Sequence, residues 1–344
     1  MKQNYSKYFP AEWAEQEFVL VVFPHKNTDW FDMLDEARDC FCEIIENILL
    51  FEDVLVICAD AESACIVENL SKNKTHQAQI VTIETDDTWA RDIAVITIFE
   101  NGEKTALDFT FNGWGEKFPA NLDNQMTYKL FADKEKIKLL SSFAYRDCRN
   151  FVLEGGSIES NGNGTILTTE KCLLSDNRNC LSKKDIEENL KKYFGAKRIL
   201  WLKNGHLAGD DTDSHIDTLA RFCNETTIAY VKCDDATDEH FIELQAMEDE
   251  LKAFRTFDGA PYRLVPLPMA DKVIADGERL PATYANFLII NGAVLLPAYN
   301  STKDDIAAAA LKNVFPERKI IKINCLPLIK QHGSLHCVTM QFPK

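Results

Sequence analysis

The sequence predicts an α/β fold built from repeated units, each made of a β-hairpin, a helix and a further strand. β-rich runs flank a turn signal at four places, and three of these signals contain Asn-Gly, a strong hairpin signal. After each of the last three hairpins, a helical pattern and then another β-rich run follow. The turn signals are Asn101-Gly102, the segment 161–164, Asn224-Glu225 and Asn291-Gly292.

The expected elements follow one another in a regular order. The hairpins pair residues 94–99 with 106–111, 151–159 with 165–169, 218–223 with 227–232, and 287–290 with 293–297. Further strands are expected at 18–23, 54–58, 79–83, 198–202 and 319–324. Helices are expected at 32–50, 123–133, 182–194, 237–254 and 302–314. The helix after Ser182 has a hydroxyl N-cap and stops at Gly195, which is typical of a helix C-terminus.

Length and composition indicate a single domain over residues 1–344. The chain is 46% hydrophobic, which is ample for a packed core, and no low-complexity tract or Pro/Gly/Ser linker divides it. A formal net charge of −16 disfavours nucleic acid and anionic membrane surfaces as partners. The acidity is compatible with a small cationic substrate, and solubility alone explains it equally well.

No stretch approaches the 18 apolar residues of a membrane span, and the N-terminus leads into no export signal, so a cytoplasmic location is expected. The eleven cysteines are scattered without a CxxC pair, so neither a disulfide framework nor a zinc ribbon is indicated. Neither a dinucleotide fingerprint nor a P-loop is present. The sequence is compatible with a homo-oligomer but does not specify one.

Reactive side chains stand at the beginnings of the hairpins. Asp92, Glu154, His215, Asn286 and Cys337 follow one another at intervals of about 50 to 70 residues, in the range of supersecondary repeats. If the units close around an axis, equivalent edges meet at the centre. That geometry would gather these residues into one pocket.

Cys337 stands before the expected final strand, close to Gly333, a residue that permits close approach of a ligand or of other backbone. On its own this thiol is more often a small buried hydrophobe than a nucleophile. His336 is adjacent, so on a strand it would point to the opposite face and is a poor candidate for activating Cys337.

The segment 209–217 is the densest polar cluster in the chain. If His215 and Asp217 begin a strand, their side chains share a face, which suits a general acid/base beside a carboxylate. A solvated acidic loop is one alternative. Another is a metal site, because Asp213-x-His215-x-Asp217 has the spacing seen in manganese ureohydrolases, although no second Asp-rich motif follows.

Two further segments combine a carboxylate with unusual neighbours. Trp89, Arg91 and Asp92 place an aromatic ring, a cation and a carboxylate before a strand, where a buried salt bridge with a packing Trp is the simpler interpretation. Glu154 ends an apolar run and precedes two glycines, which by itself indicates only a turn.

Together these segments resemble the agmatine deiminase family, within the pentein superfamily that also includes arginine deiminases, bacterial-type peptidylarginine deiminases and amidinotransferases. The resemblance spans nearly the whole chain, and so many ordered matches are far more specific than any one motif. The segments that carry it are residues 10–13, 23–30, 89–92, 111–115, 151–158, 167–174, 215–217, 284–287 and 336–341.

The resemblance implies a five-bladed α/β propeller, the pentein fold, with pseudo-fivefold repeats. It implies that Cys337 is the nucleophile, that His215 is the general acid/base, and that Glu154 orients His215. It also implies that Asp92 and Asp217 grip a guanidinium group. Neither a metal nor an organic cofactor is required.

The implied reaction converts agmatine and water to N-carbamoylputrescine and ammonia through a covalent thiouronium on the cysteine, a step of putrescine and polyamine biosynthesis. Trp89 is expected to line the pocket, and Asp210, Asp211 and Asp213 to receive the distal amine. Segments 331–337 and 211–215 depart from the usual family pattern and are expected in the pocket walls. The alternatives are a peptidylarginine or arginine deiminase, a metal-dependent ureohydrolase that releases urea, and a non-catalytic binding protein.

Overall fold

A computed structural model describes residues 6–72 and 74–344 of the chain, as five sheets of three or four strands and a separate two-stranded ribbon. The strands are β1 Lys7–Tyr8, β2 Gln16–Val22, β3 Asp53–Cys58, β4 Ala78–Thr82, β5 Ile96–Glu100, β6 Glu103–Thr110, β7 Phe143–Val152, β8 Ile158–Ser160, β9 Thr165–Thr169, β10 Arg198–Leu202, β11 Ala220–Asn224, β12 Thr227–Lys232, β13 Arg263–Pro268, β14 Ile274–Ala275, β15 Glu278–Arg279, β16 Leu288–Ile290, β17 Ala293–Ala298, β18 Lys319–Asn324 and β19 Thr339–Pro343.

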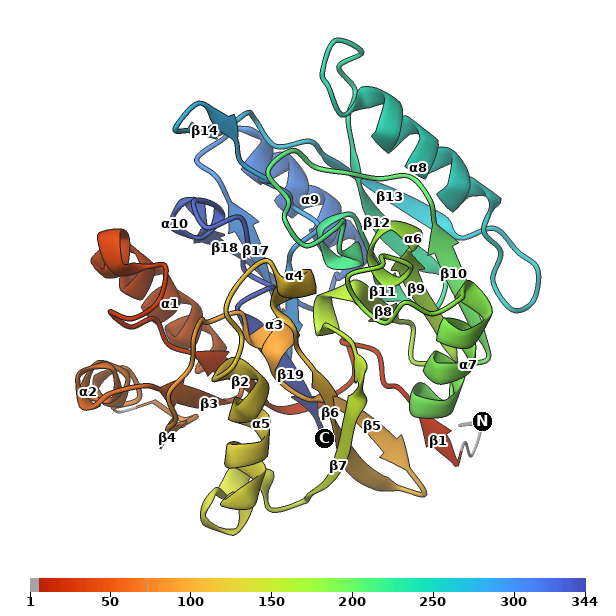
Figure 1. The fold of residues 1–344 in the computed structure, drawn as a ribbon. Coiled ribbons are helices and arrows are strands. Elements are labelled where there is room, and N and C mark those ends of the chain that lie inside the picture. The colour runs from red at the N-terminus through yellow and green to blue at the C-terminus, as the bar shows by residue number, and fades with distance from the viewer. Residues whose placement is uncertain (1–5, 73) are drawn as a thin grey trace.

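Helices connect and cover these sheets. The α-helices are α1 Leu34–Ile48, α2 Ala61–Leu70, α3 Ala90–Ile93, α4 Gly113–Glu116, α5 Asp123–Ala132, α6 Glu170–Leu173, α7 Lys183–Phe194, α8 Phe241–Ala253, α9 Lys303–Val314 and α10 Leu326–Ile329. The 3-10 turns are η1 Phe31–Met33, η2 Lys134–Lys136, η3 Lys138–Leu140, η4 Gly155–Ser157 and η5 Ile216–Thr218. Figure 1 shows α1, α2, α5, α7 and α8 at the outside of the molecule and α3 near its middle.

The five larger sheets share one pattern of pairing. In four of them an antiparallel hairpin is followed by a strand parallel to its second member: β5–β6–β7, β8–β9–β10, β11–β12–β13 and β16–β17–β18. The fifth sheet joins the two ends of the chain, since β19 pairs antiparallel with β2, and β2 pairs parallel with β3. The predicted hairpin-helix-strand repeat is therefore confirmed, and the last repeat is split between the C-terminal and N-terminal segments (Figure 1).

The second hairpin was placed wrongly by the sequence. Residues 151 and 152 end β7, which belongs to the preceding sheet and runs parallel to β6, and the hairpin begins only at Ile158. The chain turns between these strands because Ser157 donates from both its backbone N–H and its hydroxyl to the Glu154 carbonyl, forming η4. The apolar run at 151–153 thus continues one blade, and the turn after it starts the next.

The helices match the sequence closely. α7 has the expected Ser182 cap, whose hydroxyl accepts from the Asp185 N–H, and it ends at Gly195 with φ 66°. α8 begins four residues later than expected, because the Asp235 carboxylate accepts from the N–H and hydroxyl of Thr237 and holds that segment in a turn. Among the described helices, none is both long and apolar enough to cross a bilayer.

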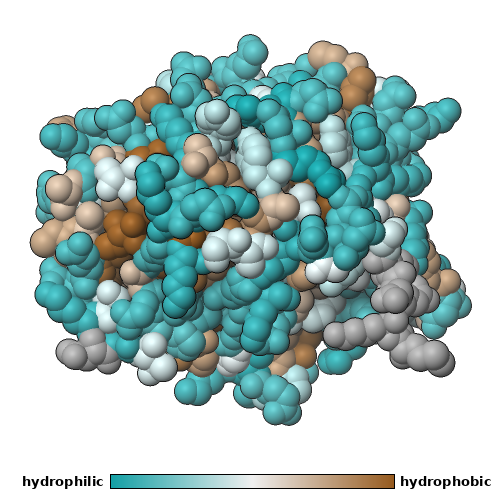
Figure 2. Space-filling view, turned by 90° about the horizontal axis from the view of Figure 1, so that it is seen from below, coloured by the Kyte–Doolittle hydropathy of each residue, from teal (hydrophilic) through white to brown (hydrophobic). Residues whose placement is uncertain are grey.

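The core is continuous from sheet to sheet. Strands β2, β16 and β17 are buried on both faces, as expected for strands covered by helices on one side and neighbouring blades on the other. Phe342 in β19 is fully buried, its ring stacked on Phe18 with centroids 4.4 Å apart and edge-on to Phe143 at 5.4 Å. Because Phe143 lies in β7, this cluster ties the split blade to its neighbour. In the view of Figure 2 the surface is mostly hydrophilic, with small apolar patches.

We expect Phe342→Ala to lower the free energy of unfolding by about 3–5 kcal/mol, because it removes a buried ring and leaves a cavity between two blades. Urea denaturation measures this. The matched control is Ile242→Ala on α8, where the side chain is 81% exposed and the change should stay within about 0.5 kcal/mol. Equal effects of the two substitutions would contradict the role of Phe342.

Candidate active site

A cavity of about 190 Å³ opens among the loops that precede the hairpins. Cys337 and Asp92 line it, and most of the other lining side chains are aromatic or acidic. The remaining lining residues are Asp29, Asp87, Trp89, Trp114, Phe118, Asp211, Thr212, Gln331, His332 and Gly333.

Beneath the cavity the reactive groups from different blades converge around Gly156 in η4. A Cβ atom on this glycine would lie 2.6 Å from His215 Nδ1, 3.0 Å from Asp92 Oδ1 and 3.1 Å from Asp217 Oδ2. Only glycine leaves room for all three side chains. The structure thus brings together residues that the sequence placed at the beginnings of separate hairpins.

Cys337 lies in a turn before β19 and not on the strand, which begins at Thr339. Asn286 fixes this turn, since its Oδ1 accepts from the backbone N–H of Cys337 at 3.3 Å and from its thiol at 3.4 Å. Burial raises the pKa of Cys337 well above its ordinary value, and the carboxylates of Asp217 and Asp92 raise it further. Both effects favour the protonated form of the thiol.

His215 also lies outside a strand. It precedes η5, where the N–H and hydroxyl of Thr218 both donate to its carbonyl, so the expected strand begins only at Ala220. Its Nδ1 is 3.7 Å from Asp92 Oδ2. Burial alone would lower the pKa of His215, but Asp92, followed by Cys172 and Glu154, raises it well above the ordinary value.

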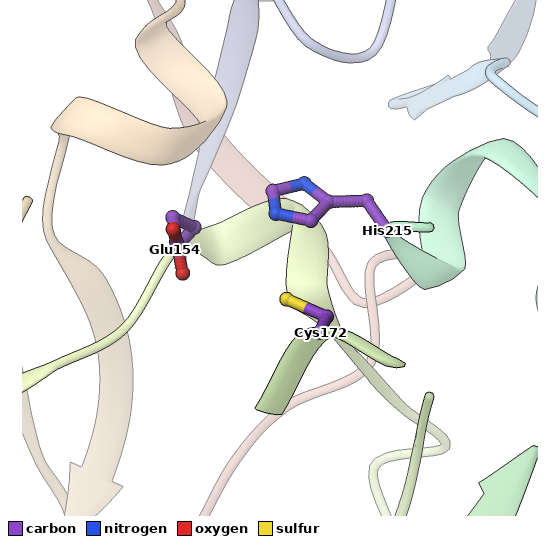
Figure 3. Close-up of side chains that lie close together, drawn as sticks. All are labelled: Glu154, Cys172 and His215. Carbon is purple, nitrogen blue, oxygen red and sulfur yellow. The ribbon is translucent and has the colours of Figure 1, made fainter. Parts of the chain in front are cut away.

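Glu154 lies beside His215, as the resemblance implied, and Cys172 of α6 completes the group (Figure 3). The sulfur of Cys172, a carboxylate oxygen of Glu154 and a ring nitrogen of His215 lie within 4.8 Å of one another, and all three residues are buried. Arg178 Nε donates to Glu154 Oε1 at 2.7 Å. Among the described residues, Glu154 Oε2 and His215 Nε2 have no hydrogen-bond partner, so this side of the imidazole faces a carboxylate and a thiol.

The alternative metal site of Asp213, His215 and Asp217 is not assembled in the described part of the chain. Asp213 turns away, with φ 68°, and its carboxylate pairs with Lys117 and Arg178 at 2.8 and 2.7 Å. The group of Glu154, Cys172 and His215 offers three donor atoms, but Arg178 already supplies a cation to this carboxylate. This arrangement suits hydrogen bonding around an imidazole better than a divalent ion.

The two carboxylates expected to hold a guanidinium differ in their partners. Asp92 accepts from Trp114 Nε1 and from the Gly156 N–H, each at 2.9 Å, and its burial, with Asp217 nearby, raises its pKa. Asp217 accepts from His336 Nδ1 at 2.7 Å through Oδ2, and its buried Oδ1 has no partner among the described residues. Burial would raise the pKa of Asp217, but the bond and charge of His336 lower it overall.

The wall of the cavity contains Trp89, as expected. Its Nε1 donates to Asp87 Oδ2 at 2.9 Å, and a Cβ on Gly333 would lie 2.1 Å from its ring, so glycine permits the ring to reach the loop before Cys337. Burial, with a contribution from Asp123, raises the pKa of Asp87 to about 8. The cavity wall thus combines an indole with acidic groups.

Asp211 lines the cavity, and burial, together with Asp210, raises its pKa. The expectation that Asp213 receives the substrate amine does not fit the structure, because its carboxylate is engaged by Lys117 and Arg178 and does not line the cavity. Asp210 accepts from the Thr212 and Ser214 backbone and shapes the loop.

Sequence reasoning missed several residues that hold this site. His336, Cys172 and Arg178 contact Asp217, His215 and Glu154 from segments far away in the chain. Cys172 falls in a segment that carried the family resemblance, which is a signal that could have identified it. His336 was set aside because a strand was expected, whereas the turn directs its ring to Asp217.

The sequence model of a family described as Porphyromonas-type peptidyl-arginine deiminase matches residues 8–343. An agmatine deiminase of Stutzerimonas stutzeri is 33% identical over 359 residues, covering 98% of this chain and 95% of that protein. Two solved structures are also similar. A protein described as a putative arginine deiminase from Porphyromonas gingivalis is 48% identical, with a TM-score of 0.91 and 98% of each chain covered. A substrate-bound agmatine deiminase from C. jejuni is 41% identical, with a TM-score of 0.90, covering 98% of this chain and 96% of that one.

We expect Asp217→Asn to accelerate alkylation of Cys337 about tenfold at pH 8, because it removes a negative charge that disfavours the thiolate and so lowers the thiol pKa. Mass spectrometry of the Cys337 peptide after timed iodoacetamide treatment measures this. Asp29→Asn, in the same cavity wall, is the control and should leave the rate unchanged. Slower alkylation in Asp217→Asn would contradict the assigned effect of this carboxylate.

Proposed function

We propose that this chain, which belongs to the Porphyromonas-type peptidyl-arginine deiminase family, is an agmatine deiminase that hydrolyses agmatine to N-carbamoylputrescine and ammonia. The observation that carries the proposal is the group of Cys337, His215, Asp92 and Asp217 at the base of an acidic cavity. The five-bladed pentein fold implied by the sequence agrees with the five sheets and with these relatives.

The paired carboxylates suit a guanidinium group. This cation is planar and resonance-stabilised, so water attacks its carbon very slowly, and it must be held and aimed at a stronger nucleophile. Asp217 Oδ1 is buried and has no hydrogen-bond partner in the described part of the chain. Asp92 accepts from two neutral donors, and His215 lies 3.7 Å from it. Charge-assisted hydrogen bonds from the substrate would satisfy both carboxylates and direct the guanidinium carbon towards Cys337.

The positive charge of the substrate also favours ionisation of the Cys337 thiol. Burial, followed by the charges of Asp217 and Asp92, raises the pKa of Cys337 and favours its protonated form. A bound cation between them offsets their charge, lowers the thiol pKa and lets the proton leave to solvent. Because the pKa of His215 is raised, its imidazole is already protonated when the thiolate forms.

The residues then act in two half-reactions. The Cys337 sulfur bonds to the guanidinium carbon, and His215 donates a proton to one nitrogen, so that the C–N bond breaks, ammonia leaves and an S-alkylthiouronium forms. Neutral His215 next takes a proton from water, whose oxygen attacks the same carbon. The C–S bond then breaks, the hydroxyl proton of the adduct passes to solvent, the ureido product leaves and the thiolate is restored. The carboxylate of Glu154 stabilises the positively charged imidazolium of His215. The steps use no metal or organic cofactor.

The acidic cavity wall favours agmatine over arginine. Agmatine carries a second cation at its far end, and the carboxyl groups of Asp211 and Asp29 line the same cavity as Cys337. Free arginine would bring its α-carboxylate towards the same groups, which disfavours it electrostatically. A metal-dependent ureohydrolase is a poorer fit because Asp213 and Asp217 are engaged by cations of the chain itself.

The proposal also covers the location, domain organisation and assembly of the enzyme. All eleven cysteines are free, which supports a reducing, cytoplasmic location. One hydrophobic core runs from Phe18 to Phe342, which supports a single catalytic domain. Assembly into a homo-oligomer stays a prediction.

Incubation with agmatine should yield a product one mass unit heavier than the substrate, with ammonia released, and rapid quenching should trap an amidine adduct on Cys337. Mass spectrometry measures both species. Cys337→Ala should lower kcat by about 10⁴-fold or more, because it removes the nucleophile. The exposed Cys65→Ala is the control and should behave as wild type. Urea release, loss of activity with chelator or faster turnover of arginine would overturn the proposal.

Asp211→Asn should weaken selection of the distal amine, because it removes a negative charge from the cavity wall. We expect KM for agmatine to rise about tenfold or more, whereas KM for n-butylguanidine, which lacks the amine, should change little. Steady-state kinetics with both compounds measure this. The exposed Asp249→Asn on α8 is the charge-matched control. A parallel rise for both compounds would assign Asp211 to the loop alone.

A further inference from the structure

His336 is buried beneath the cavity with a carboxylate on each side of its ring. Its Nδ1 lies 2.7 Å from Asp217 Oδ2, and its Nε2 lies 2.7 Å from Glu12 Oε2. The side chain is 2% exposed, so water does not compete for these contacts. The two bonds join the N-terminal segment to a carboxylate of the active site.

The surroundings of both carboxylates favour their ionised forms. Burial would raise the pKa of Glu12, but Arg221 and His336 lower it well below the ordinary value. Arg221 Nη2 donates to Glu12 Oε2 at 2.7 Å, and the Ile289 N–H donates to Oε1 at 2.7 Å. Burial would raise the pKa of Asp217, but besides His336 the charges of His215 and Arg221 lower it. An ionised carboxylate is an acceptor only, so a ring nitrogen at hydrogen-bond distance from it must be the donor.

A ring that donates from both nitrogens is an imidazolium, whereas a neutral ring would turn one lone pair towards a carboxylate oxygen. Hydrogen bonds to its backbone also hold His336 in place. Asn286 accepts from the His336 N–H at 2.9 Å, and Arg91 Nε donates to the His336 carbonyl at 3.3 Å. These contacts fix the backbone of His336 while its ring connects Glu12 with Asp217.

We propose that His336 is a positioning residue for the substrate: held as a cation between Glu12 and Asp217, it keeps Asp217 ionised and turns its free Oδ1 towards the guanidinium group. This inference rests on the proposed function. Its consequence is that Nδ1 governs substrate binding, while Nε2 attaches the ring to the N-terminal segment. The two nitrogens therefore have separable roles.

Two amide substitutions distinguish these roles. In His336→Asn the amide nitrogen can take the place of Nδ1 and keep the bond to Asp217, and in His336→Gln it can take the place of Nε2 and keep the bond to Glu12. The Cys337→Ala background binds agmatine without turnover, so calorimetry reports the dissociation constant alone. We expect about a tenfold or greater loss of affinity in the Gln variant and less than about threefold in the Asn variant.

Controls separate positioning from folding. Each variant loses one carboxylate contact, so their thermal midpoints should fall by similar amounts even though their affinities differ. His76→Asn and His76→Gln, at a half-buried histidine that pairs with Asp53 away from the cavity, should leave affinity unchanged. Equal losses of affinity in both His336 variants, or a larger loss in the Asn variant, would overturn the proposal.

A measurement on the unsubstituted enzyme covers the case in which the variants do not fold. Nitrogen-15 NMR of the histidine rings should show a proton on each ring nitrogen of His336, and a ring with one unprotonated nitrogen would overturn the proposal. The proposed function fails separately, because it requires wild-type enzyme to release ammonia from agmatine whatever the variants do.

Discussion

The antiparallel pairing of β19 with β2 is the interaction on which the site depends. It joins the last strand of the chain to the first large one and completes the fifth sheet. Thr339, the first residue of β19, is fully buried, and its hydroxyl donates to the Leu335 and His336 carbonyls at 3.2 and 3.1 Å. The turn that carries Cys337 is therefore braced against the strand. The pairing brings Cys337 towards Asp92 and His215, which come from other blades, and the Arg91 N–H then donates to the Cys337 carbonyl at 3.0 Å.

Once the five blades are assembled, the balance of buried charge decides what the site can bind. Glu154 pairs with Arg178 and Asp217 pairs with His336, so each has a cation within hydrogen-bond distance. Asp92 has two neutral donors and a histidine at 3.7 Å, and its pKa is raised. Burying a carboxylate without a cation at hydrogen-bond distance costs free energy. A planar cation that contacts Asp92 and Asp217 removes that cost and at the same time favours the Cys337 thiolate, so one charge supplies both binding and activation.

The sequence predicted the repeat because hairpin signals and helix caps are local: Asn-Gly turns, Ser182 and Gly195 act on their own neighbours. It also placed Asp92, His215 and Cys337 at equivalent positions of successive units. It failed where a side chain or hydroxyl bonds the backbone across a few residues, as Thr218 does to the His215 carbonyl, converting an expected strand into a 3-10 turn. It failed again for Asp213, because Lys117 and Arg178 approach from distant segments. Pairings of this kind depend on the closed fold and leave no local pattern.

The same contrast, between local patterns and contacts from distant segments, separates the base of the site from its wall. Asp92, His215 and Cys337 stand on short segments that directly precede β5, β11 and β19, so their positions follow from the architecture. Trp89 meets the loop at Gly333, and Asp211 lies on a loop shaped by Asp210, so the wall depends on residues that no strand constrains. Those two loops are also where the chain departs from the usual family pattern. A fold of this kind can therefore keep one chemistry at its base while its loops vary, and in this chain the loops place acidic groups in the cavity wall.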